Sequence, residues 1–129
     1  MRKSFSFAFK GILTCARTER NFRFHIAVAF YVLIASMIVR LTAAEWTLVL
    51  ICIGVVLMAE LFNTAVEKLC DEVHPGWNKG VGSVKDMTAA AVLVSAIMSA
   101  VIGGMIFFRA QKMARVAEFL NSHIPLSVL

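Results

Sequence analysis

A row of acidic and amide side chains directly follows a long apolar segment, with no helix-breaking residue between the two. The apolar segment is WTLVLICIGVVLM (46–58), and it is followed by Glu60, Asn63, Glu67 and Asp71. On an α-helix these four side chains fall within an arc of about 80° and climb through roughly 16 Å. An acidic side chain near the centre of a membrane helix costs roughly 2.5–3.5 kcal/mol, so the row predicts a functional site.

Carboxylate and amide oxygens favour a hard cation as the ligand of such a site. Magnesium fits best, because it takes one or two carboxylates together with the phosphates of a substrate. Glu19, in TERNFRFH (18–25), is a further candidate ligand, since we expect it at the same membrane interface as Glu67. Lys85 and Asp86 stand where the third apolar segment begins, and a lysine beside the exposed N–H groups of a helix N-terminus would bind phosphate.

A divalent cation, a phosphate-binding lysine and a buried carboxylate are the components of phosphoryl transfer. The usual nucleotide motifs, G-x-x-x-x-G-K-[ST] and G-x-G-x-x-G, are not found in the sequence. Two alternatives stay open at this point. The acidic groups could simply pair with nearby basic residues and hold helices together, or Glu60 and Glu67 could relay charge in a small cation- or proton-coupled transporter or channel subunit.

The composition indicates an integral membrane protein of one domain. Of the 129 residues, 60% are hydrophobic and 16% are charged, whereas soluble domains are about half apolar and a quarter charged. The net charge is +5, but the basic residues flank apolar segments and form no stripe with aromatic residues. This pattern is typical of membrane topology signals and excludes nucleic acid as the expected partner.

The apolar periodicity predicts an all-α membrane protein with a surface helix and three spans. Residues 73–86, which contain Pro75 and Gly76, predict a loop before the last span. Basic residues cluster before the first span and after the second, so the N-terminus is expected in the cytoplasm. The expected elements are an amphipathic surface helix over about 4–20, spans over about 24–41, 46–70 and 86–108, and an amphipathic C-terminal tail over 109–129.

Four stretches resemble a known family: E-x-x-N-T-A-V-E-x-x-x-D at 60–71, V-K-D at 84–86, the alanine-rich third span, and TERNFRFH at 18–25. Over residues 3–108 the chain resembles the prokaryotic integral-membrane diacylglycerol kinases and undecaprenol kinases. The resemblance implies a multi-pass enzyme of the bacterial inner (cytoplasmic) membrane, with a kinase domain over 1–108. It also implies a homotrimer whose active sites are shared between neighbouring chains. The family usually ends soon after its third span, so the tail is an addition.

The resemblance further implies an ATP-dependent lipid kinase. It would transfer the γ-phosphoryl group to the hydroxyl of diacylglycerol or undecaprenol at the cytoplasmic membrane interface. The roles implied residue by residue are Glu60 as general base, Asn63 as the group that orients the catalytic residues, Glu19 and Glu67 as ligands of Mg²⁺ with ATP, and Lys85, Asp86, Lys10 and Asp71 on the nucleotide side of the site.

Overall fold

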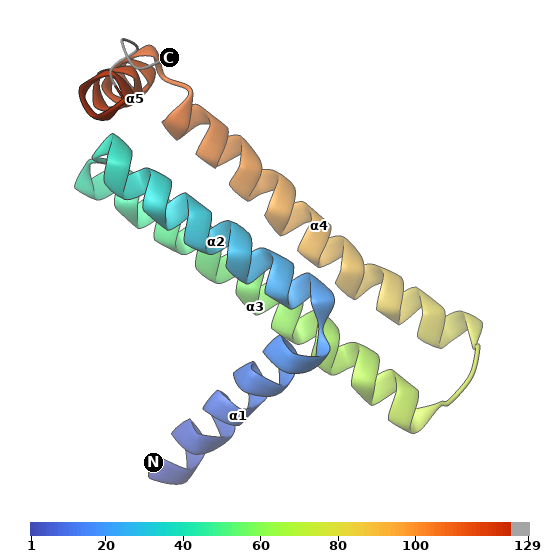
Figure 1. The fold of residues 1–129 in the computed structure, drawn as a ribbon. Coiled ribbons are helices and arrows are strands. Elements are labelled where there is room, and N and C mark those ends of the chain that lie inside the picture. Colours follow the sequence, from blue (N-terminus) through green and yellow to red (C-terminus); the bar gives the residue numbers. More distant parts are fainter. Residues whose placement is uncertain (125–129) are drawn as a thin grey trace.

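The chain is a helical hairpin extended by a third long helix, with a shorter helix at each end (Figure 1). A computed structural model describes residues 1–124, apart from the side chains of 110–112. The prediction of an all-α chain is confirmed for these residues, while the last five residues of the expected tail lie outside them. The helices are α1 (Arg2–Thr18), α2 (Arg20–Val39), α3 (Ala43–Val73), α4 (Lys79–Phe107) and α5 (Ala110–His123).

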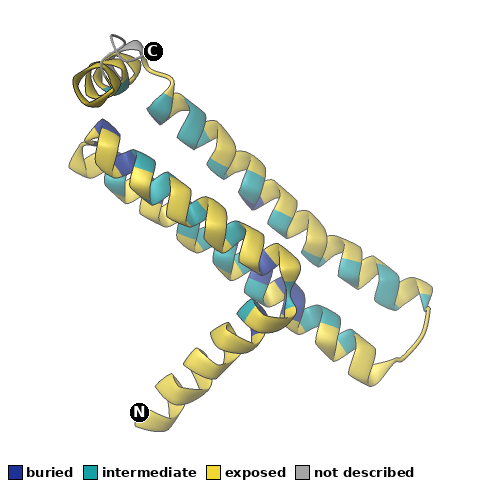
Figure 2. Ribbon diagram, viewed as in Figure 1, coloured by how far each residue is buried: buried dark blue, intermediate teal, exposed yellow. Residues whose placement is uncertain are grey.

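Three of the helices can cross a membrane. α2, α3 and α4 contain 20, 31 and 29 residues and are strongly apolar, and about 20 apolar residues span the hydrocarbon core of a bilayer. Only a third of the apolar window of α3 is buried inside the chain, and the windows of α2 and α4 are buried still less. Figure 2 shows exposed residues along all three helices. Lipid or other protein must therefore cover most of this apolar surface.

α3 is the central element of the bundle. It packs on α2 and, over a longer stretch, on α4, and α1 leaves the bundle at an angle (Figure 1). The buried apolar residues Val39, Leu41, Val49 and Ile106 form a small core at the end of the bundle where α2 passes into α3. The rest of the α3 packing face continues from this core toward the acidic residues, so α3 carries both the core and the candidate site.

A capping box starts α3 three residues before the predicted span. The Thr42 hydroxyl accepts a hydrogen bond from the Glu45 backbone N–H at 3.3 Å, and a Glu45 carboxylate oxygen accepts one from the Thr42 N–H at 3.0 Å. Such reciprocal bonds satisfy N–H groups that the first helical turn leaves without partners. From this start the helix runs unbroken to Val73, so the apolar segment and the acidic row share one helix.

The prediction of a loop over residues 73–86 is wrong for most of these residues. α4 already begins at Lys79, because the Asn78 side chain caps it by accepting bonds from the N–H groups of Gly80 and Val81. An amide cap of this kind is worth about 1 kcal/mol and offsets much of the helical cost of the glycines that follow. Lys85 and Asp86 consequently lie in the second turn of α4, so the expectation that they stand at its N-terminus is also wrong.

Candidate active site

Two of the polar residues on α3 lie on its packing face. The buried residues of this helix recur every three or four positions through Cys52, Val56, Glu60 and Asn63, so the polar row continues the apolar stripe that holds the bundle together. Glu60 is only 3% exposed and Asn63 8%. Glu67 is half-buried, and Asp71 is exposed. The row therefore leads from the interior of the bundle to solvent.

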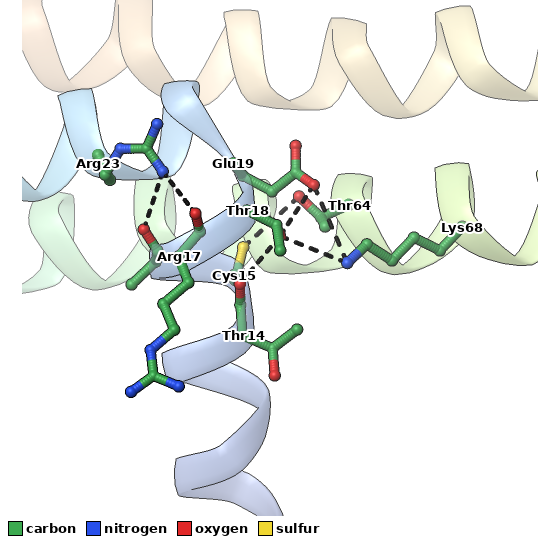
Figure 3. Close-up of polar contacts among 9 residues, drawn as sticks. Thr14, Cys15, Arg17, Thr18, Glu19, Arg23, Thr64 and Lys68 are labelled. Carbon is green, nitrogen blue, oxygen red and sulfur yellow. Dashed lines mark hydrogen bonds and ion pairs between the residues drawn. The ribbon is translucent and has the colours of Figure 1, made fainter.

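The corner between α1 and α2 brings Glu19 toward this row. Glu19 has an extended backbone and is both the C-cap residue of α1 and the N-cap residue of α2. The Arg23 guanidinium reaches back and donates hydrogen bonds to the carbonyl oxygens of Ala16 and Arg17, at 3.1 and 2.9 Å (Figure 3). These bonds satisfy carbonyls that the end of α1 leaves without helical partners. The corner is thus held in one conformation, with the Glu19 side chain facing α3.

Three further contacts attach this corner to α3 (Figure 3). The buried Cys15 thiol lies 3.6 Å from the Thr64 hydroxyl, to which it donates. The Lys68 ammonium donates to the Thr18 hydroxyl at 3.4 Å and lies 4.0 Å from a carboxylate oxygen of Glu19. Because Lys68 is half-exposed, its ion pair with Glu19 is a weak one. A cation with a higher charge could displace it.

Three carboxylates and one imidazole converge where α1, α2 and α3 meet. Glu60 lies within electrostatic range of Glu19, Glu67 and His25. Among the described residues, no three His, Cys, Asp or Glu side chains approach closely enough to enclose a metal ion by themselves. Two carboxylates are what Mg²⁺ takes from a protein when phosphates and water complete its shell. The donor set therefore fits a magnesium ion that arrives with a phosphate-bearing substrate.

α4 contributes two polar contacts to the same region. The Thr88 hydroxyl donates a hydrogen bond to the Asn63 side-chain oxygen at 2.8 Å, and the Lys85 ammonium pairs with the Asp71 carboxylate. Thr88 is a residue that our reading of the sequence missed. The signal that could have found it is its spacing, because a residue three positions after Lys85 lies on the same side of a helix.

The structure does not bring Lys10 and Asp86 to the carboxylate cluster within one chain. Both are exposed, and within the described residues neither side chain takes part in a hydrogen bond or ion pair. Lys10 belongs to α1, which projects away from the bundle (Figure 1). Lys10 precedes Cys15, the buried residue of this helix. Asp86 follows Lys85 and therefore points about 100° away from it around α4.

An apolar groove leads away from the cluster. It has a volume of about 490 Å³ and lies between α2, α3 and α4, where its lining includes Val28, Val56, Leu57 and Phe107. His25, which interacts electrostatically with Glu60, also lines it. The His25 end of the groove is therefore the end nearer Glu60, which follows the groove residue Leu57 by about one turn of α3.

The fold and the site together define a small helical membrane protein with a partly buried group of carboxylates and an apolar groove between its three long helices. The family described as prokaryotic diacylglycerol kinase matches residues 6–107. Undecaprenol kinase of Bacillus subtilis (strain 168) is 43% identical over 105 residues, which cover 81% of this chain and 85% of that protein. The chain belongs to the prokaryotic diacylglycerol kinase family and is a lipid kinase.

Two more distant relatives are also kinases. A diacylglycerol kinase of Synechocystis sp. is 32% identical over 102 residues, or 78% of this chain and 58% of that protein. A diacylglycerol kinase of Escherichia coli (strain K12) is 28% identical over 100 residues, or 77% of this chain and 81% of that protein. The alternative of a transporter or channel subunit finds no support in these relatives.

Proposed function

We propose that this chain transfers the γ-phosphoryl group of ATP to the hydroxyl of a polyprenol, namely undecaprenol. The observation that carries the proposal is the position of Glu60, which is buried, follows the groove residue Leu57 by about one helical turn and interacts electrostatically with Glu19 and Glu67. The relative named undecaprenol kinase, at 43% identity, supports a polyprenol over diacylglycerol as the acceptor.

Glu60 is the general base in this proposal. The lipid chain lies in the groove and its hydroxyl meets the Glu60 carboxylate, which accepts the hydroxyl proton as the lipid oxygen attacks the γ-phosphorus of ATP. The bond between the γ-phosphorus and the bridging oxygen breaks, and ADP leaves. Burial of Glu60 at 3% exposure keeps bulk water from the carboxylate, which disfavours transfer of the phosphoryl group to water. General-base assistance of this kind typically contributes 10²–10⁴-fold to a rate.

Glu19 and Glu67 are the residues that would hold a magnesium ion, and this ion, bound with ATP, would supply neutralisation of the phosphate charge. Glu19 is presented by the corner that Arg23 stabilises, and Glu67 stands two helical turns below Glu60 on α3. The weak contact with Lys68 keeps the Glu19 carboxylate near this position in the absence of the nucleotide.

Asn63 and Lys85 position the transferred group. Since the Asn63 oxygen accepts a hydrogen bond from the Thr88 hydroxyl, the NH₂ of the same amide remains available to donate to a phosphate oxygen or to Glu60. The Lys85 ammonium has three donors and uses one on Asp71, which leaves two for phosphate. Asp86 and Lys10 stay assigned to the nucleotide side, where a neighbouring chain would have to bring them closer to the cluster.

We also propose a homotrimer in the bacterial cytoplasmic membrane, with the N-terminus in the cytoplasm and residues 1–108 as the kinase domain. The small buried fraction of the spans supports an assembly that covers them. The exposed apolar residues Phe5, Phe9 and Ile12 of α1, together with its basic residues, support a helix lying on the cytoplasmic membrane surface.

A paired acceptor assay tests the proposed activity. The purified protein in mixed micelles receives labelled ATP and magnesium, with undecaprenol in one series and diacylglycerol in the other. We expect phosphorylated undecaprenol as the faster product. Faster phosphorylation of diacylglycerol would refute the acceptor assignment, and no lipid product in either series would refute the function itself.

A second experiment tests the assignment of Glu60. Glu60→Gln should lower kcat by about 10²–10⁴-fold with ATP binding retained, because the amide keeps the shape of the side chain but accepts no proton. The matched control is Glu72→Gln, an exposed carboxylate of the same helix, which should leave kcat unchanged. Turnover of Glu60→Gln at the parent rate would exclude Glu60 as the base.

A further inference from the structure

The last helix lies outside the part of the chain that matches the family. The match ends at residue 107, and α5 follows after two connecting residues. It packs at the end of the bundle where α2 passes into α3, away from the loop that joins α3 to α4 (Figure 1). The lipid kinase activity therefore gives no account of α5.

Three contacts fix α5 at this end of the bundle. The Arg115 guanidinium donates a hydrogen bond to the carbonyl oxygen of Arg40 at 3.1 Å, and Arg40 has the left-handed backbone (φ 55°) that ends α2. The Arg109 guanidinium lies 3.8 Å from a Glu45 carboxylate oxygen. Val116 packs against the apolar core formed by α2, α3 and α4. α5 thus cannot move far from the plane in which the membrane spans end.

One face of α5 remains apolar and exposed. Met113, Ala117, Leu120 and the cap residue Ile124 recur at intervals of four, three and four, which places them on one side of the helix. Met113, Leu120 and Ile124 are 51%, 48% and 56% exposed. Glu118 lies on the opposite side, about 160° from Leu120. The helix therefore separates apolar from polar residues, and about half of the surface of these three apolar side chains stays exposed.

The surroundings of this face are those of a membrane surface. Met37 at the end of α2, and Met105 and Phe108 at the end of α4, are exposed apolar residues at the same end of the bundle. In a bilayer these side chains contact lipid, and α5 is attached directly beside them. Exposed guanidinium groups of Arg40, Arg109 and Arg115 stand at the same level, and such groups attract anionic head groups.

We propose that α5 is an interfacial helix that binds the anionic phospholipid surface of the membrane on the side opposite the carboxylate cluster. Its apolar face enters the boundary between head groups and acyl chains, as in other amphipathic helices that lie on bilayers, and its arginines hold the bundle and the head groups together. This surface is independent of the proposed kinase site.

Fluorescence quenching in nanodiscs tests the proposal on the full chain. A reporter is introduced by Leu120→Trp on the apolar face, and by Glu118→Trp on the opposite face as the matched control; the signal of the parent chain, with Trp46 and Trp77, is subtracted. Both positions are exposed, so folding should be retained, and unchanged helical circular dichroism checks this. Phosphatidylglycerol brominated on its acyl chains probes lipid contact, and acrylamide probes contact with water.

We expect brominated lipid to quench the Leu120→Trp reporter at least about twofold more than the Glu118→Trp reporter, with the reverse order for acrylamide. Brominated phosphatidylcholine should quench the Leu120→Trp reporter less than brominated phosphatidylglycerol.

Equal acrylamide quenching at both positions would place α5 in water and overturn the proposal. Protection of the Leu120→Trp reporter from both quenchers would show that protein, for example a second copy of the chain, covers the face, and would also overturn it. Equal quenching by the two lipids would overturn the preference for anionic head groups.

Discussion

The hydrogen bond from Thr88 to Asn63 gives a quantitative prediction about catalysis. Valine at position 88 has nearly the same shape as threonine but no hydroxyl, so Thr88→Val removes the donor at 2.8 Å from the Asn63 oxygen with little change in packing. Asn63 is 8% exposed, so water replaces the lost donor poorly. A buried acceptor left without a partner costs about 1–3 kcal/mol, and the amide can regain a partner only by turning away from the orientation proposed for catalysis.

Loss of that orientation should appear in kcat. At about 1.36 kcal/mol for each factor of ten in rate, a cost of 1–3 kcal/mol corresponds to a fall in kcat of about 5- to 150-fold. The KM for ATP should stay within about twofold, because Thr88 itself contacts Asn63 and the α4 backbone rather than the nucleotide in the proposed site. Initial rates at varied ATP concentration, with saturating lipid, measure both constants.

A conservative variant separates positioning from folding. Thr88→Ser keeps the hydroxyl and should restore kcat to within about threefold of the parent protein. If Thr88 served only the packing of α3 on α4, the serine variant, which loses a methyl group, should be at least as impaired as the valine variant. Equal kcat values for Thr88→Val and the parent, or equal losses for the valine and serine variants, would refute the assigned role.

Two further predictions concern the nucleotide side and the start of α3. Lys85→Met should raise the KM for ATP by about tenfold or more, because a charge-assisted hydrogen bond contributes about 1.5–3 kcal/mol; an unchanged KM in an ATP titration would remove Lys85 from the phosphate site. Thr42→Ala should lower the free energy of unfolding by about 1 kcal/mol, since it removes the capping box. Thr47→Ala, which removes only a hydroxyl bonded to the carbonyl one turn earlier, is its control in thermal unfolding, and equal unfolding midpoints for the two variants would contradict the prediction.

Much of the helix pattern could be predicted from the sequence, because length and apolar composition suffice to indicate a span. The failure between residues 73 and 86 has a local cause. Glycines usually indicate a loop, but here Asn78 caps α4 before Gly80 and Gly82, so the helix includes them. Whether the cap outweighs the entropic cost of the glycines depends on the hydrogen bonds to the Asn78 side chain, and the sequence alone does not show that these bonds form.

The candidate site, too, could be predicted from the sequence only in part. The spacing of Glu60, Asn63 and Glu67 was enough to place them on one side of one helix, because helical geometry converts sequence intervals directly into angles. Spacing could have placed Thr88 on the same side of α4 as Lys85, but it could not show the contact with Asn63, which lies 25 positions away in the sequence. Nor could it show that Glu19 would stand near Glu60, since this depends on the corner that Arg23 holds.

The sequence by itself determined that this is a three-span helical protein of a lipid kinase family with a carboxylate row on its middle span. These properties follow from composition and from the spacing of residues within single helices, and both are local properties of the chain. Only the tertiary structure decided which helix faces meet, and with them the bond between Thr88 and Asn63, the apolar groove between α2, α3 and α4, and the attachment of α5 to the far end of the bundle. Such contacts depend on how separate helices pack against one another, and the spacing of residues within one helix does not determine that packing.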